Sequence, residues 1–297
     1  MLITAAIPDF MRCIRYEKRM SEHTAIAYQT DLGQFAGYLE QIFALDDVTA
    51  IKQIHVRSWL ASMKEQDMGE RSLQRKISSV KSLFKHLQRT GVVHTNPARD
   101  VSVPKAPKRL PAYLEQEDTQ QLALAIAYPE GLEGATQRLV VEILYQTGIR
   151  RAELTGLKES DIDFGRRQIR VLGKRNKERL IPMAPALLAE IRDYMDEKRK
   201  NFNQPTEFLL CLASGKPVYA QYVYRVVAKY ISQVTTLNKR SPHVLRHTFA
   251  TQLNTNGAEL NAVKELLGHS SLAATQIYTH NNIERLKEVY RKAHPKS

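Results

Sequence analysis

Apolar residues recur at helical spacing through the first hundred positions of the chain. Three stripes repeat every three or four residues, the first along residues 28–39, the second along 56–63 and the third along 73–87. Each stripe predicts an amphipathic helix with one buried face. The members are Tyr28, Leu32, Phe35 and Leu39; Val56, Trp59, Leu60 and Met63; and Leu73, Ile77, Val80, Phe84 and Leu87. The N-terminal third is therefore expected to form a helical domain.

The helical pattern stops in the stretch NPARDVSVPKAPKRLPAYL. This stretch is basic, has no hydrophobic period and contains four prolines, which is typical of an extended linker. We therefore expect a helical domain over residues 1–102, a basic proline-rich linker over 103–112 and a second domain over 113–297.

The second domain begins with helical patterns in EQEDTQQLALAIA and ATQRLVVEILYQTG. Its one clear β pattern is DIDFGRRQIRVLGKRNKERLIPM, in which Ile169 and Val171 alternate, GKRN turns, and Leu180 and Ile181 continue. This predicts a hairpin in a small antiparallel sheet. The pattern is helical again from Ala184, so we expect a mainly α protein whose second domain is α+β.

The net charge is +13, and it is spread over both parts of the chain. Residues 1–112 carry 17 Lys or Arg against 11 Asp or Glu, and the remainder carries 27 against 20. A basic surplus of this extent favours a long polyanion as partner over a small acidic substrate. A simple solubility surplus is the alternative.

No apolar run approaches the length of a membrane span, and Pro8 and Asp9 interrupt the N-terminal segment too early for a secretory signal. We expect a cytoplasmic protein with no membrane partner. Cys13 and Cys211 are too few for a disulfide framework or a cysteine-based zinc site, and we expect buried thiols.

The third helical stripe is unusually basic. From Arg71 to Arg99 there are seven Lys or Arg and no acidic residue. Contact with DNA phosphates explains such a stretch, although a solvated basic face is the other interpretation. The candidate DNA-binding residues are Arg71, Arg75, Lys76, Lys81 and Lys85 on the helix, with Lys105, Lys108 and Arg109 in the linker.

Two imidazoles and a guanidinium cluster in SPHVLRHTFATQL. Ser241 is a suitable N-cap and Pro242 suits the first helical position, so His243 and Arg246 should share one face near a helix start. A zinc site could use His243 with His247, but the glutamate of HExxH is absent and Arg246 would repel the metal. Cations at a helix N-terminus favour an anion site instead. We therefore expect no metal.

Five motifs in order, TGIRRAEL, VLGKRNKERLIPM, HVLRH, LLGH and IYTH, resemble the catalytic domain of the tyrosine recombinases, also called the phage integrase family. The resemblance covers residues 112–297 by motif and the N-terminal domain by layout. Within the family the chain is most similar to the Xer-type chromosome-dimer resolvases. The resemblance implies a SAM-like, core-binding N-terminal domain and the tyrosine recombinase catalytic fold.

The resemblance also implies a set of catalytic residues, none of which is substituted: Arg150, Lys174, His243, Arg246, His269 and Tyr278. The two arginines would clamp the nonbridging phosphate oxygens and Tyr278 would be the nucleophile. His243 is the candidate base and Lys174 the candidate acid, while His269 would donate to the phosphate. Glu153 and His247 also match the pattern, and we interpret them as structural.

The implied function is site-specific recombination of double-stranded DNA through a 3′-phosphotyrosyl intermediate and a Holliday junction, in chromosome dimer resolution. A homotetramer or heterotetramer on paired sites would exchange the C-terminal helix, whose stripe includes Leu286 and Tyr290, and no cofactor or ATP is expected. The alternatives are integration of a mobile element, relaxation of DNA by a type IB topoisomerase, and DNA binding without catalysis.

Overall fold

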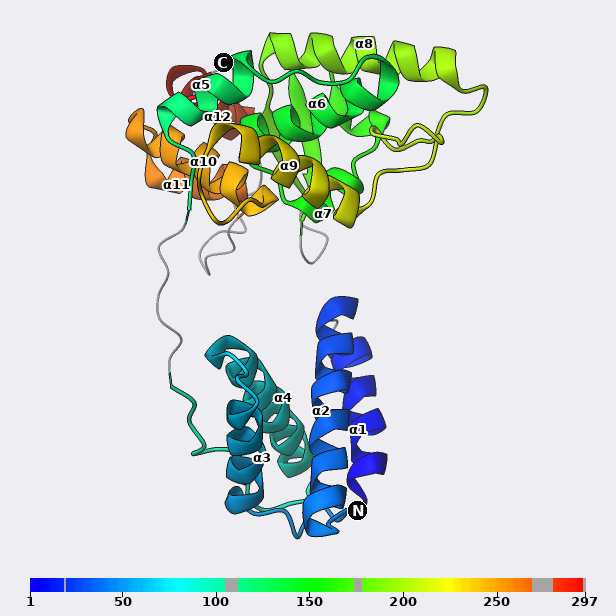
Figure 1. Cartoon of the computed structure of the whole chain (residues 1–297), viewed down its shortest axis with the longest axis vertical. Helices are drawn as coiled ribbons and strands as arrows, with labels where there is room; N and C mark the ends of the chain where they lie inside the picture. The colour runs from blue at the N-terminus through cyan, green and yellow to red at the C-terminus, as the bar shows by residue number, and fades with distance from the viewer. Residues whose placement is uncertain (19, 105–111, 174–177, 269–279, 296–297) are drawn as a thin grey trace. The chain divides into compact units, whose positions relative to one another are not determined.

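The computed structural model describes residues 1–18, 20–104, 112–173, 178–268 and 280–295. The chain divides into two compact units, Met1–Arg109 and Leu110–Ser297, and the division falls inside the segment 103–112 (Figure 1). Three candidate DNA-binding residues of that segment lie outside the described residues: Lys105, Lys108 and Arg109.

The described part of the first unit is helical. Its helices are α1 (Ile3–Arg12), the π-helical turn Cys13–Glu17, α2 (Glu22–Phe43), α3 (Gln53–Glu65) and α4 (Glu70–Arg89). The three predicted stripes lie on α2, α3 and α4 and form one core with α1, which confirms the helical prediction. Ser21 caps α2 by accepting a hydrogen bond from the backbone N–H of Thr24.

The second unit combines helices with one small sheet. The helices are α5 (Gln116–Leu124), α6 (Gly131–Thr147), α7 (Arg151–Thr155), the 3₁₀ turn Glu159–Asp161, α8 (Pro185–Asn201), α9 (Ala220–Val234), α10 (Pro242–Thr255), α11 (Leu260–Leu267) and α12 (His280–Ala293). The strands are β1 (Ile162–Asp163), β2 (Gln168–Leu172) and β3 (Glu178–Pro182). They form an antiparallel sheet in the order β1-β2-β3, which confirms the predicted hairpin.

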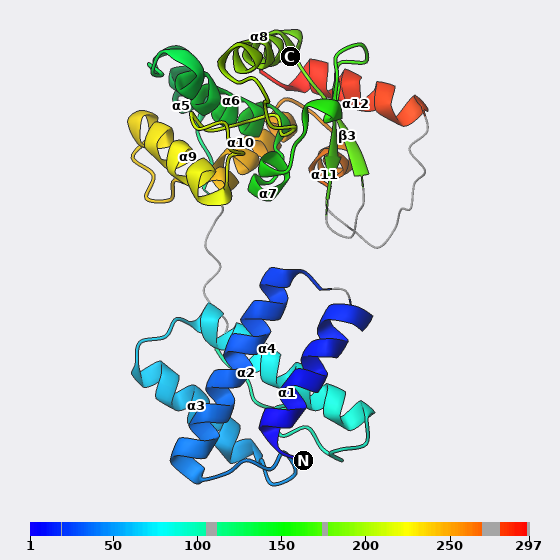
Figure 2. The ribbon, with the colours of Figure 1, turned by 90° about the vertical axis from the view of Figure 1, so that its right-hand side faces the viewer.

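Helix α6 lies at the centre of this unit and is buried along most of its length. It packs against α8, α9 and α10, and the sheet joins the same core through Ile169 and Ile181, which face each other across β2 and β3. Figure 2 shows β3 next to α11 and α12. The hairpin strand β3 therefore lies beside the last two helices of the chain.

In the single chain, α12 packs against its own domain. Leu286 and Tyr290 are buried, and the helix contacts α10 and β3. The ring of His294, just beyond the helix, stacks on that of Tyr290 with centroids 4.8 Å apart. Leu286 and Tyr290, which the family resemblance assigns to a surface of a neighbouring protomer, are thus covered in cis in the single chain. Within the described parts of the chain, no helix has the length and apolar character needed to cross a membrane.

Candidate active site

Arg150 stands at the junction between α6 and α7. Gly148 ends α6 in the left-handed region at φ 61°, and a Cβ there would lie 2.5 Å from Cδ1 of Phe249 on α10. The glycine therefore lets this turn pack directly on α10. Arg150 follows as the N-cap of α7, where its backbone N–H donates to Oε2 of Glu153 at 2.7 Å and its Nη1 donates to Oε1 at 2.8 Å.

Glu153 is shared with a second arginine that the sequence analysis missed. Arg179 of β3 donates from Nη1 and Nη2 to the two carboxylate oxygens of Glu153, at 3.0 and 2.7 Å. Burial would raise the pKa of Glu153, but the hydrogen bonds and charge of Arg179, with the bonds from Arg150, lower it below its ordinary value. Glu153 is therefore an anion that anchors two cations.

Arg246 lies on the buried side of α10. Ser241 occupies the N-cap position and Pro242 the first helical position, as predicted, although the Ser241 side chain makes no capping hydrogen bond. Arg246 donates from Nη1 to the carbonyl oxygen of Gly148 at 2.5 Å and from Nη2 to that of Leu267 at 2.6 Å. Burial, and then the charge of Arg150, lower its pKa to about 10, so it stays protonated at neutral pH.

His243 is exposed, one turn before Arg246 on the same helix. Partial desolvation lowers the pKa of its imidazole below the ordinary 6.5, and the charges of His247 and Arg246 lower it further. Partial desolvation, and then the charges of Arg246 and Lys239, lower the pKa of His247. Both rings are therefore neutral at pH 7, and a neutral imidazole can accept a proton.

The structure brings Arg150 and Arg246 together at the end of α11, and His243 lies one turn before Arg246 on α10. Arg150 is linked to that helix end by a 3.3 Å bond from Nη2 to the carbonyl oxygen of Gly268. The other three candidates lie outside the described residues: Lys174, His269 and Tyr278. In the described ranges no group of three or more His, Cys, Asp or Glu side chains could hold a metal ion. The arrangement is suited to binding an oxyanion.

On the first unit, two of the predicted DNA-binding residues serve an internal network. Asp31 of α2 is fully buried, and its carboxylate accepts from Arg75, from Lys76 at 3.1 Å and from Ser79 at 2.9 Å. Lys76 is only 4% exposed and also bonds to Gln34. Its ammonium group therefore joins α4 to α2 and is not available to a phosphate in this conformation.

The outer face of α4 offers the remaining candidates. Arg71 and Lys85 are exposed and Lys81 is partly exposed. Arg71, Arg75 and Lys81 line a hollow of about 550 Å³ whose other side is the segment Val101–Val103. This face has the charge and the accessibility that contact with a DNA backbone requires.

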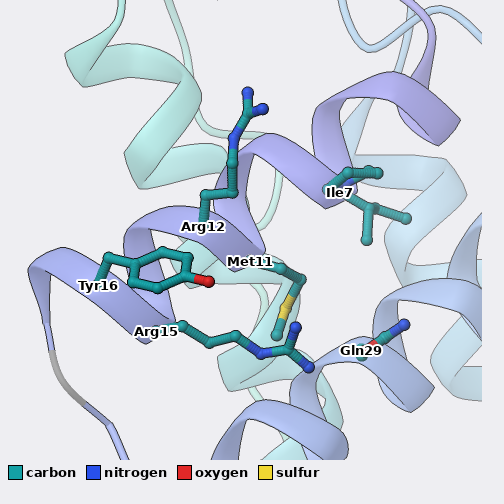
Figure 3. Close-up of a pocket in the computed structure, with 7 residues that line it drawn as sticks. Ile7, Met11, Arg12, Arg15, Tyr16 and Gln29 are labelled. Atoms are coloured by element: carbon teal, nitrogen blue, oxygen red, sulfur yellow. The ribbon is translucent and has the colours of Figure 1, made fainter.

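A separate hollow of about 330 Å³ lies between α1, the π-helical turn and α2 (Figure 3). Met11 lies in it, Tyr16 is 76% exposed beside it, and Arg15 extends toward Gln29. Arg15 already pairs with Glu22 at 3.4 Å. None of the candidate site residues lines this hollow.

The second unit has an α+β fold, and two arginines from separate elements bond to carbonyls at the end of α11. The model of the phage integrase family matches residues 112–285, and that of the phage integrase N-terminal SAM-like domain matches residues 7–91. The chain therefore belongs to the phage integrase family and is a tyrosine site-specific recombinase.

Individual relatives agree with this membership. A tyrosine recombinase XerC from Pelobacter propionicus is 37% identical, with 98% of this chain and 95% of the relative covered. Two solved structures share the fold. One is the XerH recombinase bound to palindromic difH in a post-cleavage complex, with a TM-score of 0.70, 23% identity and coverage of 89% and 78%. The other is a lambda integrase tetramer bound to a Holliday junction, with a TM-score of 0.68, 18% identity and coverage of 94% and 80%.

Proposed function

We propose that this recombinase cleaves and rejoins DNA through a 3′-phosphotyrosyl intermediate on Tyr278, and that it resolves chromosome dimers in the cytoplasm. The observation that carries the proposal is the convergence of Arg150 and Arg246. They come from separate elements, yet they bond to the adjacent carbonyls of Gly268 and Leu267. Two guanidinium groups held side by side can bind both nonbridging oxygens of one phosphate.

The chemistry follows from the charge that develops on the phosphate. Attack by an oxygen nucleophile adds negative charge to the nonbridging oxygens, and Arg150 and Arg246 would stabilise it. A phenol has a pKa near 10, so Tyr278 needs help to lose its proton. His243 is the proposed base because its lowered pKa keeps the ring neutral.

The leaving 5′ oxygen needs a proton, and Lys174 is the proposed acid. An ammonium group on a long side chain can donate a proton and carries a positive charge close to the leaving group. His269 would donate a hydrogen bond to the phosphate. The covalent intermediate conserves the energy of the phosphodiester bond, so resealing needs no ATP.

The proposed partner is double-stranded DNA, bound by the outer face of α4 and by the catalytic unit. The lambda integrase neighbour was solved as a tetramer on a Holliday junction, and we propose a homotetramer or heterotetramer with exchange of α12 for this chain. The XerC relative, 37% identical over nearly the whole chain, supports chromosome dimer resolution. Integration of a mobile element is the alternative with the same chemistry.

The test is covalent trapping. Protein is crosslinked to DNA through its own reaction in cells, the adducts are purified under denaturing conditions and the attached DNA is sequenced. Recovery of one chromosomal site supports dimer resolution, whereas recovery of the ends of a mobile element favours integration.

A nicked suicide substrate that contains the recovered site then tests the chemistry. Wild type should form an adduct that survives a denaturing gel. Tyr278→Phe should bind the same DNA and form none, because only the attacking oxygen is removed. Absence of any adduct from wild type would leave a DNA-binding protein without catalysis.

A further inference from the structure

Three arginines meet at the C-terminal end of α11. The carbonyls of residues 266–268 each accept from a different guanidinium group. The pairs are Arg179 Nε with Leu266 at 2.9 Å, Arg246 Nη2 with Leu267 at 2.6 Å and Arg150 Nη2 with Gly268 at 3.3 Å. The last carbonyls of a helix have no partner inside the helix, and they carry partial negative charge. The end of α11 is thus a shared acceptor for side chains from three separate elements.

Arg179 differs from Arg150 because all three nitrogens of its guanidinium group bond to the protein. Its side chain is 4% exposed, whereas that of Arg150 is 28% exposed. Its Nε bonds to Leu266, and Nη1 and Nη2 hold both oxygens of Glu153. In this conformation the carboxylate of Glu153 pairs the positive charge of Arg179, so Arg179 is not offered to a phosphate, whereas the bonds of Arg246 are to neutral carbonyls. Arg179 can therefore act only through the groups that it holds.

The most important of those groups is the carboxylate of Glu153. Of the described residues, it is the one carboxylate that bonds to any of these three arginines. Without Arg179, the negative charge of Glu153 would be balanced by Arg150 alone. The carboxylate would then compete with a phosphate for the guanidinium group of Arg150. With Arg179 in place, Glu153 orients Arg150 while Arg179 balances its charge.

The position of Gly268 fits the same arrangement. Its φ is 62°, which favours glycine, and a Cβ there would lie 3.1 Å from Cδ and 3.2 Å from Nη1 of Arg179. The missing side chain leaves room for Arg179 beside the helix end. The carbonyl of the same residue accepts from Arg150. Gly268 is therefore in contact with both arginines: Arg179 lies where a side chain would stand, and Arg150 bonds to the carbonyl oxygen.

We propose that Arg179 is a positioning residue for recombination. Through Glu153 and the end of α11 it holds Arg150 in place and leaves the charge of Arg150 available to the phosphate. This inference rests on the proposed function. Lysine could not replace Arg179, because one ammonium group cannot hold both oxygens of a carboxylate and a carbonyl in the same fixed geometry.

The experiment measures the rate of adduct formation on the nicked substrate at saturating protein, together with the dissociation constant for the same DNA. We expect Arg179→Gln to lower the rate by about 100-fold, the cost of a displaced catalytic group, while the dissociation constant changes by less than about threefold. Arg179→Lys keeps the charge and should lower the rate by about tenfold. Adding Glu153→Gln to Arg179→Gln should cause little further loss, because the two residues act as one unit.

Lys198→Met is the matched control for lost stability. Lys198 of α8 is also fully buried, and its Nζ pairs with Glu159 at 2.6 Å and bonds to the carbonyls of Thr206 and Phe208. These partners make no bond to the three arginines. The control should lower the melting temperature as Arg179→Gln does, yet keep the wild-type rate at a temperature where it is folded.

The outcomes separate the two proposals. An Arg179→Gln rate equal to that of wild type, or reduced no more than that of Lys198→Met, would overturn the positioning role. If Arg179→Gln does not fold, an Arg179→Lys rate equal to that of wild type would overturn it as well. A wild-type chain that forms no adduct would overturn the proposed function itself.

Discussion

Two lysines on α4 should behave differently when they are replaced. Lys85 is exposed, whereas Lys76 is 4% exposed and bonds to the buried carboxylate of Asp31 at 3.1 Å. We expect Lys85→Ala to weaken DNA binding and leave stability unchanged. Lys76→Met should lower stability and leave the salt dependence of binding unchanged.

The magnitudes follow from the two environments. Loss of one phosphate contact makes the plot of log K against log salt less steep by about 0.9. When the salt concentration rises fourfold, the ratio of the wild-type association constant to that of Lys85→Ala should therefore fall by about 3.5-fold. Lys76→Met leaves the carboxylate of Asp31 buried with Arg75 and Ser79. Breaking such a buried pair costs about 3 kcal/mol in the free energy of unfolding.

The assay is fluorescence anisotropy of a labelled duplex over a series of salt concentrations, with thermal denaturation of each variant. Two duplexes of unrelated sequence should weaken alike in Lys85→Ala, because phosphate contacts carry no sequence information. Equal slopes for wild type and Lys85→Ala would mean that Lys85 makes no phosphate contact. The basic face of α4 would then be a solvated surface, the other interpretation of this stretch. A change of slope in Lys76→Met at a temperature where it is folded would refute the assignment of Lys76 to the interior.

Three further predictions concern the catalytic unit. Lys174→Ala should be rescued by a substrate with a 5′-bridging thiol, because this leaving group needs no proton; equal loss on both substrates would contradict the acid role. Because the pKa of His243 is lowered below 6.5, the ring stays neutral as the pH falls through 6.5, and the cleavage rate should decline only at lower pH; the same decline in His243→Gln would exclude this residue as its source. Truncation after His280 removes Leu286 and Tyr290 from the core, so we expect a lower melting temperature. Truncated protein that is folded and still pairs cooperatively on a full site would contradict exchange of α12.

The helices of the first unit could be predicted because their signal is local. Leu32, Phe35 and Leu39 place an apolar residue on the same face at each turn of the helix. All three side chains are fully buried. The hairpin could also be predicted, since Ile169 and Val171 alternate with polar residues on β2, and Ile169 faces Ile181 across the two strands. Helix α1 was not singled out, although Ile3, Ala6 and Phe10 follow helical spacing, because Pro8 stands inside its ten residues and a proline typically ends or interrupts a helix.

Charge alone could not separate the outer face of α4 from its inner face. The sequence analysis grouped Lys76 with Lys85, since both belong to a stretch with no acidic residue. The helical period held the missing information, because position 76 lies between Leu73 and Val80 at spacings of three and four residues. Its partner Asp31 is 45 positions away, however, and no local pattern could identify it.

Arg179 was missed for a related reason. It lies two residues before Ile181 on β3, and alternate residues of a strand share one face, so the pattern places a charged side chain on the inner face. A buried arginine needs a charged or hydrogen-bonding partner, but the strand pattern does not identify which residue that is. The partner, Glu153, lies on α7, 26 positions away in the sequence, and only the tertiary structure brings the two side chains together. The motif indicated candidate catalytic residues but not how Arg150 is held.

The cis position of α12 is compatible with exchange between protomers. Leu286 and Tyr290 are buried against residues of the same domain, and burying each such side chain contributes about 2 kcal/mol. A neighbouring copy would present an identical surface, so a helix that moves to it loses and regains the same contacts. Exchange of an identical element therefore has a low cost in free energy. Whether α12 packs in cis or on a neighbour then depends on geometry. Exchange requires that the paired DNA sites place two protomers close enough for α12 of one to reach the surface that α12 of the other has left.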